Sequence, residues 1–240
     1  RILADRLQRS VTLSPRQKAF IPADGCLTNT LILDSVIREA RRRKTELNVV
    51  ALDVSKAFDS VSRHSITRAL QRFNICPDFI KFISNSYNAC TTTIVAGPTE
   101  CKDVKMTRGV KQGDPLSPML FNMIIDELLT SLPPAIGFPL GDQLINCLGF
   151  ADDVVLLSSS KSGMDTLLEM SSTFFNCRNL KLNVLKSFVL RLVPSVKNRV
   201  VVVDRNPKFL LCGKPLKVIN HANPFSYLGI NFDPSGKLSL

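Results

Sequence analysis

The chain has 240 residues, and a hydrophobic content of 45% with an aromatic content of 7% excludes a disordered protein. Its net charge of +11, from 31 Lys and Arg against 20 Asp and Glu, favours a polyanionic partner, with nucleic acid ahead of an acidic membrane surface. The sequence contains no signal peptide and no apolar run long enough to cross a bilayer, so no membrane partner is expected.

The seven cysteines are scattered, without CxxC or CxxH spacing, and only His64 and His221 could assist them. A zinc site is therefore not expected. An odd number of scattered cysteines is typical of reduced intracellular thiols, and we expect most of them to be buried.

The first well-defined predicted element is a helix over residues 27–43, where apolar residues recur with a helical period. Its expected inward stripe consists of Leu27, Leu31, Val36 and Ala40. Asn29 and Arg38 lie off this stripe. The basic run 41–44 complements the negative end of the helix dipole, and a template-phosphate contact or a nuclear-import signal is the alternative.

Next come a strand at 47–54, a helix at 63–73 capped near Ser62, a helix after Pro77, and a hairpin of 91–96 with 101–107 around Gly97-Pro98. Ser117 and Pro118 are expected as N-cap and first residue of the following helix. Strands are then predicted at 144–149 and 154–158, a helix at 163–176, and short strands near 187–193, 199–203, 209–212 and 226–230. Alternating strands and helices with several hairpins predict an α+β fold rather than a doubly wound parallel sheet.

Three aspartates stand where apolar strands end: Asp53 closes one strand, and Asp152 and Asp153 lie between two. Adjacent carboxylates in apolar surroundings repel each other and are costly to desolvate, and a divalent cation removes both problems. Mg²⁺ prefers a few carboxylates plus water and phosphate. Two such ions about 4 Å apart can activate an attacking hydroxyl and stabilise leaving pyrophosphate. A bare Asp-Asp pair is, however, more often only a turn.

Strand geometry separates the roles of these aspartates. Successive side chains on a strand point to opposite faces, so Asp152 and Asp153 should not be equivalent ligands. We expect Asp152 to bridge both ions together with Asp53, and Asp153 to have a supporting or single-metal role. The backbone carbonyl of Val54 is a candidate to complete one coordination shell.

The segment 108–118 precedes the Asp pair and carries a second set of candidate contacts. Gly109 and Gly113 permit close backbone approach, and Gln112 offers a donor and an acceptor to an incoming base or ribose. Arg108 and Lys111 can meet phosphate. A Gly-Asp-Pro turn before a helix explains the same residues without a ligand. The absence of a GxxxxGK loop disfavours a P-loop NTPase.

Taken together, these segments resemble the reverse transcriptase of non-LTR (type-1) retrotransposons, most closely the ribosomal-DNA-inserting R-two class. The matching blocks follow the family's order along nearly the whole chain. They are Phe20–Cys26 with Asn29, Leu52–Asp59, Arg108–Pro118, Phe150–Asp153, Leu180–Lys186 and Tyr227–Asn231.

The resemblance implies roles for individual residues. Asp53, Asp152 and Asp153 match the metal-binding triad, with two Mg²⁺ ions, or Mn²⁺ as a substitute. The nucleotide-binding positions implied are Phe58 as a steric gate against the ribose 2′-hydroxyl, Gln112, Gly113, and Lys186 at the pyrophosphate. Tyr227, Leu228 and Gly229 match the primer-grip hairpin. Without the resemblance, Phe58 would be read as core, Lys186 as solvated surface, and Tyr227–Gly229 as a buried turn.

Two further positions are notable. Asp59 stands where the family has an acidic residue, and helix capping is its simplest role. Phe150 takes the place of a tyrosine found in many relatives, which puts a hydrogen bond from that position in doubt but not the metals.

The implied fold is a right-hand polymerase palm with an antiparallel sheet plus partial helical fingers. We expect partial fingers at 1–45, a palm with inserted finger elements at 46–220, and a primer-grip hairpin leading to a thumb at 221–240. The chain is expected to be a fragment of a Pol polyprotein, with fingertip residues before Arg1 and a thumb, a zinc knuckle and an endonuclease after Leu240.

The implied function is RNA-directed DNA polymerisation, used for target-primed cDNA synthesis in the nucleus. The implied partners are an RNA template, a DNA primer or target DNA, and dNTPs. Two alternatives stay open: a metal-dependent nuclease that uses the same aspartates, and a non-catalytic nucleic-acid-binding remnant of a decayed element. The intact triad argues against decay.

Overall fold

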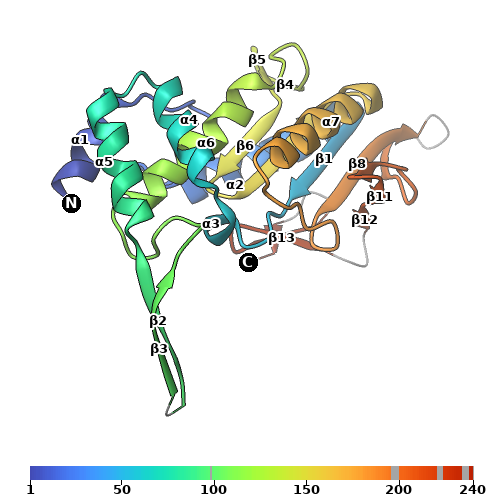
Figure 1. Cartoon of the computed structure of the whole chain (residues 1–240). Coiled ribbons are helices and arrows are strands. Elements are labelled where there is room, and N and C mark those ends of the chain that lie inside the picture. The colour runs from blue at the N-terminus through green and yellow to red at the C-terminus, as the bar shows by residue number, and fades with distance from the viewer. Residues whose placement is uncertain (98, 196–199, 221–223, 234–237, 240) are drawn as a thin grey trace.

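The computed structural model describes residues 1–97, 99–195, 200–220, 224–233 and 238–239 (Figure 1). The helices are α1 (Ile2–Ser10), α2 (Gly25–Arg43), α3 (Ala57–Ser60), α4 (Arg63–Arg72), α5 (Pro77–Asn88), α6 (Ser117–Ser131) and α7 (Lys161–Cys177). Together with the sheets described below, they confirm the predicted α+β class. In the described part of the chain, none of these helices is long and apolar enough to cross a membrane.

The central sheet has the strand order β12-β8-β1-β7-β6, with β9 also paired to β8. Its strands are β1 (Leu47–Leu52), β6 (Cys147–Phe150), β7 (Asp153–Ser158), β8 (Phe188–Ser195), β9 (Val200–Val203) and β12 (Lys217–Val218). All pairs are antiparallel except β12 with β8. The sequence-adjacent β6 and β7 form the hairpin that carries the Asp pair.

Both faces of this sheet are covered. Val50 and Leu52 of β1 point into a core shared with α4, α5, α6 and α7, whereas Leu47 and Val49 point into a second core with α2. This alternation follows from the two-residue period of a strand and explains why β1 is apolar on both faces. The sheet therefore has α4–α7 on one face and α2 with residues 225–232 on the other.

The predicted inward-facing apolar stripe of α2 is wrong for the N-terminal half of the helix. Val36 and Ala40 are fully buried, but Leu27 is 49% and Leu31 51% exposed, and Asn29 is completely buried. The cause is the close approach of α2 to another backbone segment: a Cβ on Gly25 would lie 1.9 Å from the carbonyl oxygen of Lys18. This contact turns the face with Gly25 and Asn29 inward.

Smaller elements complete the fold. A hairpin of β2 (Thr91–Ala96) and β3 (Thr99–Lys105) projects from the body (Figure 1). The expected turn residue Pro98 lies outside the described residues. The predicted strand 144–149 is divided, because β5 (Gln143–Ile145) pairs with β4 (Phe138–Leu140) and only β6 joins the central sheet. The remaining strands are β10 (Leu210–Leu211), β11 (Lys214–Pro215), β13 (Phe225–Tyr227), β14 (Ile230–Phe232) and β15 (Leu238–Ser239).

Two caps were predicted with different success. The Ser62 hydroxyl accepts from the Ser65 amide at 3.0 Å, as expected for an N-cap. Ser117 is instead the first residue of α6, after Leu116. Its hydroxyl donates to the carbonyl oxygen of Lys111 at 2.6 Å and so ties the helix start to the preceding turn.

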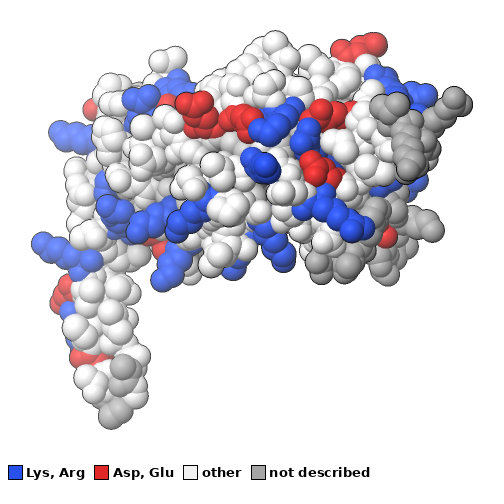
Figure 2. Space-filling model, turned by 90° about the vertical axis from the view of Figure 1, so that its right-hand side faces the viewer, with Lys and Arg blue, Asp and Glu red and all other residues white. Residues whose placement is uncertain are grey.

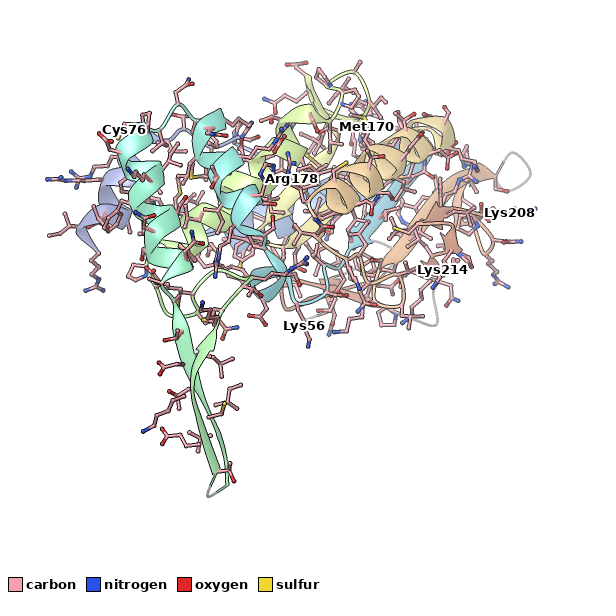
Figure 3. The ribbon with its side chains drawn as sticks, in the orientation of Figure 1. Lys56, Cys76, Met170, Arg178, Lys208 and Lys214 are labelled. Carbon is pink, nitrogen blue, oxygen red and sulfur yellow. The ribbon has the colours of Figure 1, made fainter. Side chains whose placement is uncertain are left out.

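The expectation that most cysteines are buried is wrong. All seven cysteines are free, only Cys147 is buried, and Cys90 is half-buried. The exposed ones include Cys76, which directly precedes α5 on the outside of the molecule (Figure 3). Most of these thiols lie next to helix or strand ends, where the chain is at the surface.

Candidate active site

Asp53 and the Asp pair meet at one end of the central sheet. The register of β1 with β7 pairs Leu52 with Val154, so the next residues, Asp53 and Asp153, stand side by side. Phe150 pairs with Asp153 across the β6–β7 hairpin, which leaves Ala151 and Asp152 as its two-residue turn. The two neighbouring aspartates are therefore inequivalent, with Asp152 in the turn and Asp153 in the strand.

The turn is held in an unusual conformation. Ala151 has a φ of 52°, in the left-handed region. A side chain there costs about 1–2 kcal/mol, and such strain persists only where surrounding contacts impose it. The Ala151 amide donates to the side-chain oxygen of Gln17 at 3.0 Å, and this contact comes from a segment far away in sequence.

The carboxyl groups destabilise one another's charge. Burial, followed by the neighbouring carboxylates of Asp152 and Asp53, raises the pKa of Asp153 to about 6. Burial also raises the pKa of Asp152, and the charge of Asp53 adds to that shift. Carboxylates that disfavour each other's ionisation at one sheet end are suited to a divalent cation, which would favour the ionised form of all of them.

The aspartates would supply only some of the ligands of a metal ion and leave its other coordination positions to water and substrate. Among the described residues, no three His, Cys, Asp or Glu side chains are grouped closely enough to form a ready ligand set. The aspartates nevertheless interact electrostatically with each other. Mg²⁺ is commonly bound by one or two carboxylates and takes its other ligands from water and substrate phosphates, so this donor set fits that ion.

The loop that carries Lys186 is tied to the backbone of Asp53. The Asp53 amide donates to the Ser187 hydroxyl at 3.0 Å, and that hydroxyl donates to the carbonyl oxygen of Asn183 at 2.8 Å. The Asn183 amide in turn donates to the carbonyl oxygen of Asp53 at 2.8 Å. Sequence reasoning missed Ser187 and Asn183, although both lie in or beside the Leu180–Lys186 block.

Val54 follows directly and forms an isolated antiparallel bridge with Leu182. The hydrogen bonds that flank this bridge use the Asp53 carbonyl and the Ser55 amide, and neither involves the Val54 carbonyl. The proposed ligand role of that carbonyl stays a prediction.

A cavity of about 280 Å³ unites three of the predicted groups. Its lining includes Asp53 and Asp153, the exposed Lys186, and the turn Tyr227–Gly229. These residues come from segments that the sequence places far apart. Asp153, rather than Asp152, is the member of the pair that lines this cavity, and the division of roles between the two aspartates stays a prediction.

Tyr227–Gly229 belongs to the β13–β14 hairpin, in which Tyr227 pairs with Ile230. Leu228 and Gly229 form its two-residue turn with φ values of 49° and 80°. Two residues with positive φ are typical of the turn type that matches strand twist in tight hairpins. Tyr227 is buried, which raises the pKa of its hydroxyl, and that hydroxyl accepts a hydrogen bond from the Asn29 side chain at 3.3 Å.

Phe58, Gln112 and Gly113 line a separate cavity of about 400 Å³ in front of α6. The Phe58 ring stacks on Phe121 with 4.5 Å between centroids. The Val110 amide donates to the carbonyl oxygen of Phe58 at 2.8 Å and fixes the glycine-containing turn to α3. The structure thus brings these predicted nucleotide contacts together but leaves Lys186 with the other cavity.

One expectation for this region is corrected. Asp59 is not a helix cap, because it lies within α3 and its carboxylate accepts from the Gln112 side chain at 2.9 Å. The expected phosphate contact of Lys111 stays a prediction, and in the structure its ammonium contacts the Ser86 hydroxyl at 3.3 Å and lies 5.2 Å from the Tyr87 ring centroid.

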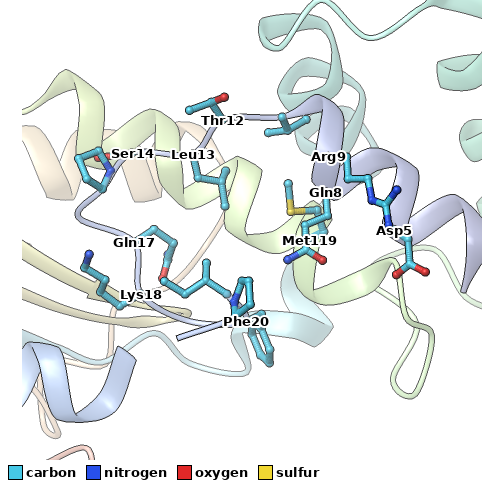
Figure 4. A pocket seen from close by; sticks show the side chains of 14 residues that line it. Asp5, Gln8, Arg9, Thr12, Leu13, Ser14, Gln17, Lys18, Phe20 and Met119 are labelled. Atoms are coloured by element: carbon cyan, nitrogen blue, oxygen red, sulfur yellow. The ribbon is translucent and has the colours of Figure 1, made fainter. Parts of the chain in front are cut away.

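A further cavity, of about 670 Å³, lies between α1, residues 11–22 and Met119 of α6 (Figure 4). Gln17 and Phe20 are among its lining side chains. Phe20 is 53% exposed and meets the Phe58 ring edge-on at 6.4 Å.

On the face shown in Figure 2, Lys and Arg outnumber Asp and Glu, as expected for a surface that meets a polyanion.

Comparisons with known proteins agree with this geometry. Residues 1–232 match the family described as "Reverse transcriptase (RNA-dependent DNA polymerase)". The chain is 43% identical over 240 residues to a retrovirus-related Pol polyprotein from type-1 retrotransposable element R2 of Popillia japonica, with 98% of this chain and 33% of that protein covered. It is 36% identical over 237 residues to the Pol polyprotein from type-2 retrotransposable element R2DM of Drosophila melanogaster, with 99% of this chain and 22% of that protein covered.

Solved structures show the same fold. Telomerase from Candida tropicalis, in complex with a fragment of telomeric RNA, aligns with a TM-score of 0.61 at 10% identity and covers 99% of this chain and 36% of that one. The apo form of that telomerase aligns with a TM-score of 0.60. The expected right-hand polymerase fold is therefore confirmed. The chain itself spans 22% and 33% of the two R2 polyproteins compared.

Proposed function

The chain belongs to the reverse transcriptase (RNA-dependent DNA polymerase) family, with R2 non-LTR retrotransposon polyproteins among its relatives, and we propose that Asp53, Asp152 and Asp153 carry its two-metal nucleotidyl transfer. The observation that carries this proposal is the meeting of Asp53, Asp153, Lys186 and the Tyr227–Gly229 turn around one cavity. Separate sequence blocks thus supply metal ligands, a cation for phosphate and a hairpin for the primer at the same place.

Each group has a definite task in this proposal. Mg²⁺, or Mn²⁺ in its place, would be held by the three aspartates with the Val54 carbonyl, and it would supply activation of the primer 3′-hydroxyl and stabilisation of pyrophosphate. The protein's own residues orient the reactants. Lys186 meets the departing phosphate, and the Tyr227–Gly229 turn holds the primer end.

The incoming dNTP is positioned by the second cavity. Phe58 lines this cavity and its ring is supported by Phe121, and in this proposal it acts as the steric gate against a ribose 2′-hydroxyl. The side chain of Gln112 and the backbone at Gly113 contact the nucleotide. Gln112 is already oriented by its hydrogen bond to Asp59, so less conformational entropy is lost when the nucleotide binds.

For the full natural protein, we propose target-primed cDNA synthesis in the nucleus, with an RNA template, a DNA primer at the target site, and an additional endonuclease. The domain division into fingers at 1–45, palm at 46–220 and primer-grip hairpin at 221–240 is part of the same proposal. One structural fact bears on it: α2, within the proposed fingers, packs directly on the central sheet and shares a core with β1.

Primer extension by the full natural protein, with RNA template, dNTPs and Mg²⁺, tests the proposal. Asp152→Asn should lower activity by at least about 100-fold, because several kcal/mol of transition-state stabilisation depend on the metal ligands. Asp165→Asn, at an exposed carboxylate on α7 paired with Lys161, is the matched control and should keep activity. Retained extension in Asp152→Asn would refute the mechanism. Cleavage of nucleic acid in the absence of dNTPs, abolished by substitution of Asp53, would indicate a nuclease. Binding of nucleic acid without nucleotide incorporation would indicate a non-catalytic remnant.

A further inference from the structure

Residues 16–19 lie against the outer edge of β6, the last strand of the central sheet. Gln17 forms a parallel bridge with Gly149. The Gly149 amide donates to the carbonyl oxygen of Arg16 at 2.9 Å, and its own carbonyl accepts from the Lys18 amide at 2.9 Å. This segment is therefore fixed to the strand that leads into the Ala151-Asp152 turn.

The side chain of Gln17 reaches past this bridge to the turn itself. Its oxygen accepts from the Ala151 amide at 3.0 Å and from the Ala19 amide at 3.1 Å. One atom thus joins the edge segment to the residue with the left-handed φ of 52°. The φ of Ala151 turns the backbone that follows relative to its N–H, so an acceptor that fixes this N–H is one of the contacts that hold the turn in its strained conformation.

The nitrogen of the Gln17 side-chain amide makes no such contact. Gln17 is only 2% exposed, and its side-chain nitrogen is buried without a hydrogen-bond partner among the described residues. A buried unpaired donor is destabilising, so a residue that merely filled this space would be better as an apolar side chain of the same length. The position is thus explained by the acceptor, not by packing.

We propose that Gln17 is a positioning residue for the catalytic turn: its side-chain oxygen holds the Ala151 amide, and through it the backbone that directs the Asp152 carboxylate. Gln17 does not touch the substrate in this role. The inference rests on the proposed function of Asp152, but the hydrogen bond on which it depends can be measured without any reaction.

The experiment uses the full natural protein with two substitutions at one site. Gln17→Met keeps length and volume but removes the acceptor, and Gln17→Glu keeps an acceptor. Asn48→Leu is the matched control, since Asn48 is fully buried, donates to Glu46 and to the Ser158 carbonyl, and lies at the far end of β1 from Asp53. Each variant is measured for primer-extension kcat and KM, thermal unfolding, and amide hydrogen exchange in a peptide spanning residues 150–153.

We expect Gln17→Met to lower kcat by about 10- to 100-fold with little change in KM for dNTPs, as a small misplacement of a reacting group does. Amide exchange at Ala151 should become faster in Gln17→Met and stay slow in Gln17→Glu, which should recover part of the kcat. Asn48→Leu should keep the wild-type kcat even if its Tm falls as far as that of Gln17→Met.

An unchanged kcat in Gln17→Met, or a loss that merely equals that of Asn48→Leu at the same Tm, would overturn the positioning role. Unchanged exchange at Ala151 in Gln17→Met would overturn the hydrogen bond itself. If the wild-type protein showed no polymerisation at all, the proposed function would fail, and the exchange measurement would still decide whether Gln17 holds the turn.

Discussion

Asn29 and Tyr227 are joined by a hydrogen bond across 198 residues of sequence, with the Asn29 side-chain amide donating to the Tyr227 hydroxyl at 3.3 Å. The same amide nitrogen donates to the carbonyl oxygen of Gly149 at 3.0 Å. Helix α2 is thereby bonded both to β6, which leads into the Ala151-Asp152 turn, and to the β13–β14 hairpin. A single buried side chain thus joins the edge strand of the central sheet to the β13–β14 hairpin.

This arrangement predicts unequal effects on stability. Asn29→Leu removes both bonds and should cost about 1–3 kcal/mol. Tyr227→Phe leaves the Asn29–Gly149 bond intact and should cost only about 0.5–1.5 kcal/mol. Thermal unfolding can separate the two, since each kcal/mol lowers Tm by roughly 2–4 °C in a domain of this size. Equal losses in the two variants would show that the Gly149 bond contributes nothing.

Phe58 provides a test of sugar selection. Phe58→Ala should raise ribonucleotide incorporation relative to deoxyribonucleotide by at least about 10-fold, because a pocket that excludes one small group discriminates by about 1–3 kcal/mol. The measurement is the ratio of the kcat/KM values for the two nucleotides. A general loss of activity from the lost stacking on Phe121 lowers both values and cancels in the ratio.

Phe20→Ala is the control for this prediction. It removes the edge contact on the same ring at 6.4 Å, but Phe20 lines the large cavity in front of α1 rather than the Phe58 cavity. Sugar discrimination should stay at the wild-type value in this variant. An unchanged ratio in Phe58→Ala would exclude the gate.

Local patterns in the sequence were sufficient for most elements. The apolar run of β1, the Ser62 cap and the strands around the Asp pair depend on near neighbours, and the structure has them within a few residues of the predicted positions. The burial of Asn29 could not be predicted in this way. Its polar character argues for an exposed position, and its partners Gly149 and Tyr227 are brought to it only by the folded sheet.

The same limit applies to the site. The blocks identified Asp53, Lys186 and Tyr227–Gly229, and the register of the sheet is what brings them to one cavity. Gln17 carried no signal, because a glutamine between Arg16 and Lys18 reads as solvated surface. Its burial depends on pairing with β6, more than a hundred residues later.

Cys147 is expected to differ from the other thiols in reactivity. Burial raises its pKa to about 12, so at pH 8 it is both inaccessible and protonated, and the thiolate is the reactive form. The exposed Cys26, Cys76, Cys101, Cys177 and Cys212 should react with a thiol reagent in the native protein. Cys147 should react only at the rate of unfolding, which mass spectrometry of labelled peptides can measure. Labelling of Cys147 as fast as Cys76 would contradict the buried position of β6.

The pair of Arg72 with Asp126 joins α4 to α6 and should be important for stability. Asp126 is almost fully buried, and its carboxylate accepts from Arg72 at 2.5 Å and from the Ser14 amide at 2.5 Å. Arg72→Met would leave a buried charge without its cation, at a cost of about 3–5 kcal/mol.

The matched substitution is Arg42→Met, at a solvent-exposed arginine paired with Glu39, and it should destabilise the protein far less, because water screens a pair at the surface. Denaturant unfolding of both variants measures the difference. Similar unfolding midpoints for Arg72→Met and Arg42→Met would mean that water reaches the Asp126 carboxylate.

Two glycines of the turn before α6 allow backbone strain and backbone contact to be separated. Gly113 has a φ of 84° with nothing within 4 Å of an added Cβ, so Gly113→Ala should cost only the left-handed strain of about 1–2 kcal/mol. Gly109 has a φ of 88°, and an added Cβ would lie 3.1 Å from both the Cα and the carbonyl oxygen of Asp59.

Gly109→Ala should therefore cost more than Gly113→Ala, and it should also move α3, which carries Phe58. The measurements are the free energy of unfolding and the discrimination between dNTPs and rNTPs in primer extension. We expect discrimination to fall in Gly109→Ala, because its added methyl group displaces the backbone beside the Phe58 ring. A Gly109→Ala protein that is no less stable than Gly113→Ala, with unaltered discrimination, would show that the turn and α3 move independently.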